Sequence, residues 1–196
     1  MKLIGITGGI GSGKSIVCKV FATMGIPIYE ADSSAKSLMN NDLLLKKSIK
    51  NLLGEQAYTP KGEYNRVWVA SQVFNNPNLL KQLNAIVHPR VRQDAEQWIQ
   101  QHSNAAFLLY EAAIMKAAGE GNNFDKVIVV NAPIDLRIKR VQMRDSRSDQ
   151  EIEDIIARQI PDEERLRIAD FVIDNDEKIP LLQQILDLEV IIMRIK

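Results

Sequence analysis

The fold of this chain is decided by the stretch Gly8-Gly9-Ile10-Gly11-Ser12-Gly13-Lys14-Ser15. The stretch satisfies the spacing G-x-x-x-x-G-K-[ST]. It lies between an apolar run at 3–7 and an apolar pattern of helical spacing at 14–24. Glycines let the backbone wrap closely around phosphate oxygens, and the N-terminus of the following helix adds a partial positive charge. The sequence therefore predicts a buried strand, a phosphate-binding loop and a helix.

Five residues of this loop have predicted tasks in holding a nucleoside triphosphate. The backbone N–H groups of Gly11, Ser12 and Gly13 are expected to turn toward the phosphates. Lys14 is expected to reach the β- and γ-phosphates, and the hydroxyl of Ser15 is expected to ligate Mg²⁺. The alternative is a glycine-rich turn that binds nothing, but the flanking strand and helix patterns favour nucleotide binding.

Composition and charge narrow the class of protein. The 196 residues are 45% hydrophobic, which suits one domain with an inserted subdomain. Since 25 basic residues balance 25 acidic ones, we expect no nucleic-acid or membrane surface. The one cysteine, Cys18, lies in an apolar pattern and has no partner for an internal disulfide, so it predicts a core position and a reducing compartment. No run approaches the roughly 18 apolar residues of a membrane span, and we expect a cytoplasmic protein.

Short apolar runs alternate with helical patterns, which predicts an α/β fold with a parallel central sheet and helices on both faces. The expected strands are at 3–7, 26–31, 106–110, 126–131 and 171–174. Residues 33–103 contain helical patterns and no convincing strand, which is far longer than the crossover of a simple βαβ unit. We therefore expect a three-layer nucleotide-binding core, a helical insertion and a small helical lid. The expected ranges are 1–32, 104–140 and 168–196 for the core, 33–103 for the insertion and 141–167 for the lid.

Two features favour a small-molecule kinase over a GTPase switch or an ATPase motor. Asp32 follows the second strand, where ligands collect in such sheets, and its carboxylate could accept the proton of an attacking hydroxyl. The alternative is that Asp32 caps a helix beginning near Ser34. Arg140 and Arg144 precede a capping-box pattern at 148–151. Arginines on a lid would stabilise a transferring phosphate, although a single arginine more often lies on a solvated helix face.

The motifs closely resemble those of the dephospho-coenzyme A kinases, over almost the whole chain and in the same order. The run at 5–15 matches the opening of that family, and Asp32 matches the last acid of its D-A-D element. The further matches are Gly62 followed by Arg66, Val73-Phe74, His88-Pro89, Leu108-Leu109-Tyr110-Glu111, Arg140, Arg144-Asp145, Gln159, Ala169-Asp170 and Asp174-Asn175. The resemblance implies a P-loop kinase fold with a helical domain that binds the acceptor and a lid.

The resemblance also implies ATP-dependent phosphorylation of the ribose 3′-hydroxyl of dephospho-coenzyme A, the last step of coenzyme A synthesis. Asp32 would be the general base, and Lys14 and Arg140 would stabilise the transferring phosphate, with Arg144 beside the nucleotide. ATP and dephospho-coenzyme A are then the expected small-molecule partners, and Mg²⁺ the expected metal. We expect neither nucleic acid nor membrane as a partner, and a monomer or weak homo-oligomer.

Four residues are further candidates for acceptor binding. Arg66 and Arg90 are expected to meet the acceptor's phosphates, because arginine suits bidentate contacts with anions. Pro89 suits the first position of a helix, so His88 is expected either to cap that helix or to touch the acceptor. Glu111 ends an apolar run as a Walker-B acid does. It is expected to hold Mg²⁺ through water or to contact the acceptor, with a structural bond to the insertion as the alternative.

The sequence departs from the family pattern at three positions. Ile16 stands where the family usually has threonine, so a hydroxyl contact is lost, although the backbone N–H of Ile16 can still face a phosphate. Glu30 replaces the first acid of the D-A-D element, and Phe107 stands where proline is common. Two alternatives remain. One is a related nucleoside or nucleotide kinase with another acceptor, and the other is a non-catalytic nucleotide-binding regulator, which only Ile16 favours.

Overall fold

The computed structural model of the protein describes residues 1–145 and 147–195, which divide into two compact units. Unit 1 is Met1–Tyr29 with His102–Lys196, and unit 2 is Glu30–Gln101. The sequence placed the helical insertion at 33–103. What each unit binds stays a prediction.

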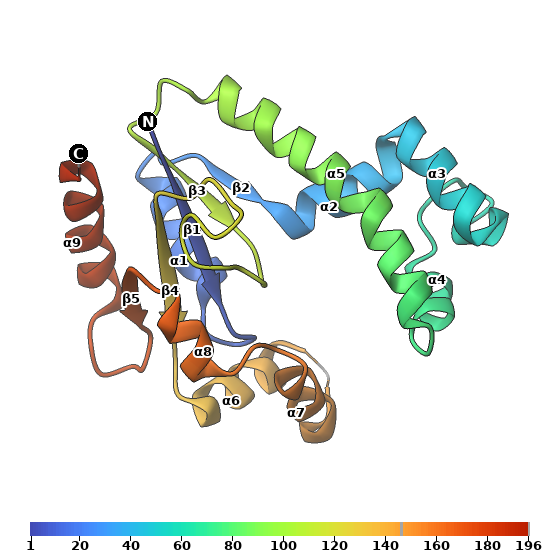
Figure 1. The fold of residues 1–196 in the computed structure, drawn as a ribbon. Coiled ribbons are helices and arrows are strands. Elements are labelled where there is room, and N and C mark those ends of the chain that lie inside the picture. Colours follow the sequence, from blue (N-terminus) through green and yellow to red (C-terminus); the bar gives the residue numbers. More distant parts are fainter. Residues whose placement is uncertain (146, 196) are drawn as a thin grey trace. The chain divides into compact units, whose positions relative to one another are not determined.

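Unit 1 is built around a five-stranded sheet in the order β2-β3-β1-β4-β5 (Figure 1). The strands are β1 (Lys2–Gly8), β2 (Ile28–Glu30), β3 (Phe107–Glu111), β4 (Lys126–Asn131) and β5 (Phe171–Asp174). β1 pairs in parallel with both β3 and β4, and β4 pairs in parallel with β5. The predicted α/β fold with a parallel central sheet is confirmed.

The two faces of the sheet are covered by different elements. α1 (Lys14–Thr23) and α9 (Leu181–Arg194) pack on the face to which Ile128 and Val130 of β4 point. Val127 and Val129 point to the other face, where they pack with the connection after β3 and with Ile168 at the end of α8 (Asp162–Arg167). Because side chains alternate along a strand, β4 is buried on both faces, as a three-layer fold requires.

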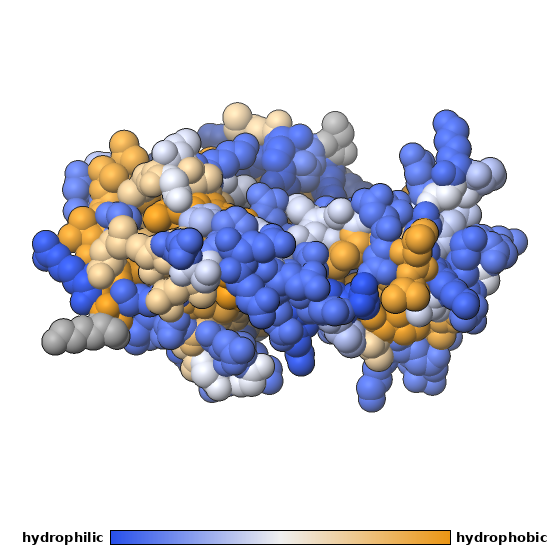
Figure 2. Space-filling view, turned by 90° about the horizontal axis from the view of Figure 1, so that it is seen from above, coloured by the Kyte–Doolittle hydropathy of each residue, from blue (hydrophilic) through white to orange (hydrophobic). Residues whose placement is uncertain are grey.

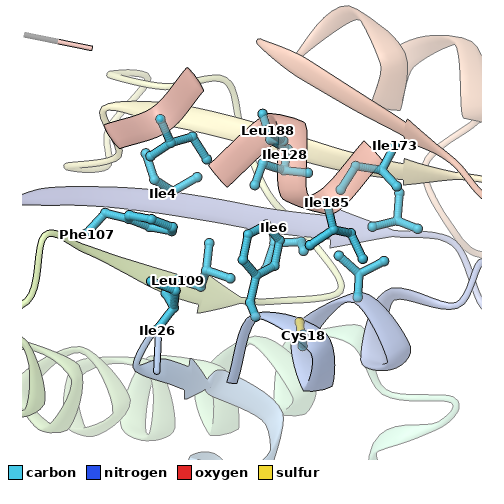
Figure 3. Close-up of a cluster of buried hydrophobic side chains, with 14 residues drawn as sticks. Ile4, Ile6, Cys18, Ile26, Phe107, Leu109, Ile128, Ile173, Ile185 and Leu188 are labelled. Carbon is cyan, nitrogen blue, oxygen red and sulfur yellow. The ribbon is translucent and has the colours of Figure 1, made fainter. Parts of the chain in front are cut away.

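The main core of unit 1 lies between the sheet, α1 and α9 (Figure 3). Its buried members are Ile4, Ile6, Val17, Cys18, Phe21, Ile26, Phe107, Leu109, Ile128, Val130, Ile173, Ile185, Leu188 and Ile192. Cys18 is among them, so its predicted core position is confirmed. Burial of one such aliphatic side chain contributes about 1.5–3 kcal/mol. The cluster therefore fixes the end of β1 against the start of α1, and the loop joins these two elements.

α9 is apolar on more than one side. It packs on the core through Ile185, Leu188 and Ile192. Its exposed apolar residues are Leu182, Leu186, Val190, Ile191 and Met193. In Figure 2, apolar side chains gather at the end of unit 1 that carries α9. Within the described ranges, no helix is both long and apolar enough to cross a membrane.

α6 (Ile134–Arg144) and α7 (Asp149–Ala157) lie between β4 and α8 in the chain. The predicted capping box is present, because Ser148 Oγ accepts from the Glu151 amide and the Glu151 carboxylate accepts from the Ser148 amide. α7 ends at Ala157, and a separate short helix, α8, follows it. Pro161 has no N–H to continue the helical ladder, so α8 begins anew at Asp162.

Unit 2 is helical, and its elements are α2 (Ala31–Asn41), α3 (Leu43–Leu53), the short 3-10 helix η1 (Glu55–Ala57), α4 (Arg66–Val73) and α5 (Pro77–Gln101). Their apolar faces meet in a second core of Leu45, Ile49, Ala57, Tyr58, Val69, Leu83 and Val87. Trp68 packs against this core.

α5 corrects one prediction. The sequence favoured a new helix at Pro89 with His88 as its cap, but α5 runs through both residues. A proline inside a helix removes one backbone hydrogen bond and costs on the order of 3 kcal/mol. Leu83 and Val87 before the proline and Ala95 after it are all buried, and their burial outweighs that cost.

Candidate active site

The predicted phosphate-binding loop follows the carboxyl end of β1 and leads directly into α1. Gly11 and Gly13 have left-handed backbones, with φ of 76° and 90°, which residues with a side chain rarely adopt. Gly13 is the N-cap of α1 and has no side chain to occupy the first amides of the helix. The turn therefore suits an anion at the positive end of α1.

Ile16 lies in the first turn of α1. Its N–H donates to the carbonyl of Gly13 at 2.9 Å, and this bond closes the first turn of the helix. Its predicted contact with a phosphate stays a prediction. The Ile16 side chain is 55% exposed.

Ser12 tests whether the loop fits a polar ligand. The residue is 1% exposed, and its Oγ has no hydrogen-bond partner among residues 1–145 and 147–195. A buried hydroxyl without a partner costs about 1–3 kcal/mol, and native proteins leave few of them. A phosphate oxygen would satisfy this hydroxyl, so the residues present fit a bound nucleotide.

Lys14 at the start of α1 forms an ion pair with Glu111 at the end of β3. Glu111 lies opposite Ile6 of β1 in the sheet register, so parallel pairing brings the carboxylate to the loop. The two side chains are 13% and 16% exposed, and their attraction is less screened than at a fully solvated surface. The ion-pair partner of Glu111 is therefore a loop residue. Its predicted roles toward Mg²⁺ or the acceptor stay predictions.

The two arginines of α6 predicted to meet the nucleotide differ in their surroundings. Arg140 Nη2 donates to the Asn175 carbonyl and to a Glu177 carboxylate oxygen, each at 3.0 Å. Its Nη1 is buried and has no hydrogen-bond partner within the described part of the chain. Arg144 is 62% exposed, and its hydrogen bonds to Asp145 raise the pKa of the guanidinium. Arg140 therefore has a buried donor to offer an anion, whereas Arg144 is a solvated residue with an acidic neighbour.

In unit 2, Asp32 lies two residues after β2 and in the first turn of α2, where its side chain is exposed. The helix begins at Ala31 and its N-cap is Glu30, so the alternative of Asp32 capping a helix near Ser34 is wrong. A carboxylate in the first turn is stabilised by the helix dipole.

The other predicted acceptor-binding residues of unit 2 lie on separate helices. Arg66 is the first residue of α4, and His88 lies within α5; both are exposed. Arg90 is also on α5, but Asp42 accepts from its Nε at 2.7 Å and Gln93 accepts from its Nη1 at 2.6 Å. The guanidinium of Arg90 is thus engaged within unit 2.

Similarity to known proteins decides the family. A model of the dephospho-CoA kinase family matches residues 2–180. The chain belongs to this family. It is 37% identical over 185 residues to a dephospho-CoA kinase of Bacteroides fragilis (strain YCH46), which covers 94% of this chain and 90% of that protein. It is 40% identical over 180 residues to a dephospho-CoA kinase of Chlorobium chlorochromatii (strain CaD3), covering 89% and 85%.

Solved structures agree with the family. The dephospho-CoA kinase from Campylobacter jejuni has a TM-score of 0.64 and 25% identity, with 97% of each chain covered. TT1252 from Thermus thermophilus has a TM-score of 0.86 and 29% identity, with 97% of this chain and 96% of that chain covered. The resemblance found in the sequence is confirmed, and so is the P-loop kinase fold. The protein is an enzyme of the dephospho-CoA kinase family, a group of transferases.

Three side chains of this dephospho-CoA kinase family member hold the loop in a way that the sequence did not reveal. Gln159 Oε1 accepts from the Ile10 amide at 2.9 Å, and Arg137 Nε donates to the Ile10 carbonyl at 2.9 Å. Asn175 Nδ2 donates to the Ser12 carbonyl at 2.8 Å. Gln159 and Asn175 carried part of the family resemblance, and Arg137 belongs to an arginine-rich pattern. Neither signal indicated a contact with the loop.

Proposed function

We propose that this protein transfers the γ-phosphoryl group of ATP to the ribose 3′-hydroxyl of dephospho-coenzyme A, giving coenzyme A and ADP. The observation that carries the proposal is the family match over residues 2–180. A loop with an unsatisfied buried Ser12 hydroxyl and a buried free donor on Arg140 supports it, because both suit phosphate oxygens.

The donor side of the reaction uses unit 1. The amides of Gly11, Ser12 and Gly13 bind phosphate oxygens, and Lys14 and Arg140 stabilise the charge that spreads over the transferring group. Arg144, at the end of α6, contacts the nucleotide. Mg²⁺, when bound, neutralises charge on the β- and γ-phosphates, and Ser15 with an exposed side chain would hold it. Since Mg²⁺ takes most of its ligands from water and phosphates, one hydroxyl from the protein is enough to hold it.

On the acceptor side, the 3′-hydroxyl oxygen bonds to the γ-phosphorus as the bond from that phosphorus to the β-phosphate oxygen breaks. Asp32 takes the hydroxyl proton, because its exposed carboxylate follows the carboxyl end of a parallel strand. Arg66, His88, Arg90 and Glu111 bind the rest of the acceptor. Residues 33–103 are the acceptor-binding insertion, and residues 141–167 are the lid. We also propose that the protein is cytoplasmic and acts as a monomer or weak homo-oligomer without nucleic acid or membrane.

The decisive assay offers dephospho-coenzyme A, adenosine and AMP separately, each with ATP and Mg²⁺, and measures ADP release and product mass. We expect turnover with dephospho-coenzyme A at least a hundredfold above either competitor. A higher rate with adenosine or AMP would favour the related nucleoside or nucleotide kinase. ATP binding without turnover of any acceptor would favour a regulator.

Asp32→Asn tests the proposed base. We expect kcat to fall by on the order of a hundredfold or more, the usual worth of a positioned base, with ATP affinity within twofold of the wild type. Asp135→Asn is the matched control, because Asp135 is an exposed carboxylate in the first turn of α6. Equal rates for the Asp32 variant and this control would show that Asp32 is not the base.

A further inference from the structure

Side chains from outside the loop hold both the N–H and the carbonyl of the loop residue Ile10, which belong to the two peptide groups on either side of its Cα. Its N–H donates to Gln159 and its carbonyl accepts from Arg137, each at 2.9 Å. We call Arg137 and Gln159 the Ile10 clamp. Arg137 is on α6 and Gln159 follows α7, so both come from the helical segment after β4.

Arg137 is itself fixed in place. It is 2% exposed, and its Nη1 donates to both carboxylate oxygens of Asp162, at 2.8 and 2.7 Å. Arg165 donates to the same carboxylate. A buried guanidinium with a carboxylate on one edge and a loop carbonyl on the other has little freedom to turn. Because Arg137 cannot turn, its hydrogen bond fixes the direction of the Ile10 carbonyl in the loop.

The glycines of the loop show how closely Arg137 approaches. A Cβ on Gly9 would lie 2.3 Å from Arg137 Nη2, and a Cβ on Gly11 would lie 2.4 Å from the Arg137 backbone oxygen. Neither separation is possible for real atoms, so any side chain at these positions would push Arg137 away. The phosphate-loop pattern does not require glycine at position 9. The close approach of Arg137 explains why this residue is glycine.

Arg137 sets the direction of an amide that is predicted to bind phosphate. In a trans peptide the C=O and the following N–H point in opposite directions. Since the Ile10 carbonyl points at Arg137, the Gly11 N–H points to the opposite side of the loop. Gln159 holds the preceding peptide group, Gly9–Ile10, so the backbone on both sides of the Ile10 Cα is fixed. We propose that Arg137 and Gln159 are positioning residues: Arg137 orients the Gly11 N–H toward the phosphates of ATP, and Gln159 keeps Ile10 in the position that this orientation requires. Donors held in place before binding lower the free-energy cost of ordering the loop on binding.

Gln159→Met tests the clamp because methionine keeps the length of the side chain and removes the acceptor. Gln150→Met is the matched control, since Gln150 is exposed on α7 and its amide donates to Asp154 rather than to the loop. Calorimetric titration with ATP in the absence of acceptor should give a Kd about tenfold higher for Gln159→Met and unchanged for the control. A Kd within twofold of the wild type for Gln159→Met would overturn the proposal.

Steady-state kinetics separate positioning from general loss of structure. With Gln159→Met we expect the KM for ATP to rise about tenfold, while the KM for dephospho-coenzyme A stays within twofold. An equal rise in both KM values would indicate a general structural defect and would contradict the proposal. This kinetic arm rests on the proposed function. The ATP titration does not, so a wild type that used another acceptor would end the proposed function and leave the clamp result standing.

Arg137→Lys supplies a second, independent variant. Lysine keeps the charge but cannot bond the Ile10 carbonyl and both oxygens of Asp162 with one planar group. We expect the Kd for ATP to rise at least fivefold, measured at a temperature below the melting range of every variant. Because the two clamp residues hold adjacent peptide groups of the same residue, the double variant should weaken binding by less than the product of the single effects. A full product would mean that they act separately and would contradict a shared clamp.

Discussion

At the scale of the residue, what the loop can offer a ligand depends on which of its polar atoms already have hydrogen-bond partners. Side chains from outside the loop hold the Ile10 N–H and carbonyl, the Ser12 hydroxyl is buried without a partner in the described chain, and the Ile16 amide closes the first helical turn. These groups therefore differ in how readily they can bond a ligand. Ser12 offers a free hydroxyl, whereas Ile16 offers an exposed apolar side chain.

Ile16→Thr should tighten ATP binding. A hydroxyl at this exposed position in the first turn of α1 can donate to a phosphate oxygen, and a hydrogen bond to a charged group contributes about 1.5 kcal/mol or more when well placed. We expect a Kd for ATP about fivefold lower by calorimetry, allowing for imperfect geometry. Ile16→Val is the control, because valine has nearly the shape of threonine without the hydroxyl. Equal affinities for the two variants would show that the position does not reach the phosphates.

At the scale of the element, unit 2 joins two helices through one carboxylate. Asp42 is the N-cap of α3 and accepts from the Leu44 and Leu45 amides, at 2.9 and 3.1 Å. It also accepts from Arg90 on α5. Burial opposes ionisation of Asp42, but the hydrogen bonds from Leu45 and Arg90 outweigh it and hold the pKa of the carboxyl below its ordinary value. Asp42, which the sequence analysis did not single out, thus joins α3 to α5 in the proposed acceptor domain.

Asp42→Ala should destabilise unit 2 by about 2 kcal/mol, of which the lost cap contributes about 1 kcal/mol and the lost ion pair the rest. Asp42→Asn keeps a capping oxygen and should lose only about half as much. Urea unfolding followed by circular dichroism measures both. Because the folded pKa of Asp42 is depressed, its contribution is present above the unfolded pKa of about 4 and is lost as the pH falls through the folded value. The gap between wild type and Asp42→Ala should therefore narrow in acid, and a constant gap from pH 7 to pH 2 would contradict this assignment.

At the scale of the whole molecule, the two units have separate cores, and apart from Glu111 the residues proposed to bind the acceptor lie in unit 2. The core of unit 1 supports the loop, and the core of unit 2 joins α3, η1, α4 and α5. A ligand stabilises the part that binds it by RT ln(1 + [L]/Kd), which is about 2.7 kcal/mol at a hundredfold excess over Kd. Each substrate should therefore protect its own unit.

Hydrogen exchange with mass spectrometry can test this division. ATP should slow exchange in the loop at 8–16 and in α6, by up to about a hundredfold in the slowest amides at a hundredfold excess over Kd. Dephospho-coenzyme A should slow exchange in α2, α4 and α5. Adenosine at the same concentration is the control for nonspecific effects. Protection by dephospho-coenzyme A confined to unit 1 would contradict the assignment of residues 33–103 as the acceptor-binding insertion.

The sequence by itself determined the fold class, the sheet and the loop. Strands alternate with helices in patterns that depend on local spacing, and the loop needs glycine, lysine and serine at fixed positions because phosphate binding uses backbone geometry. The capping box at Ser148 and the core position of Cys18 were also predictable from neighbouring residues. Local rules failed where burial outweighed them, as at Pro89, which the sequence read as a helix start and α5 keeps in its interior.

Only the tertiary structure decided which side chains hold the loop. Arg137 and Gln159 are more than a hundred residues from Ile10 in the chain, and Asn175 is 163 residues from Ser12. Their contacts exist because the parallel sheet brings the ends of β1, β4 and β5 to one edge, and no spacing rule encodes such a meeting. In the sequence, Gly9 and Gly11 were only permissive residues of a loop. In the folded protein their lack of a side chain leaves room for Arg137, since a Cβ at either position would collide with it.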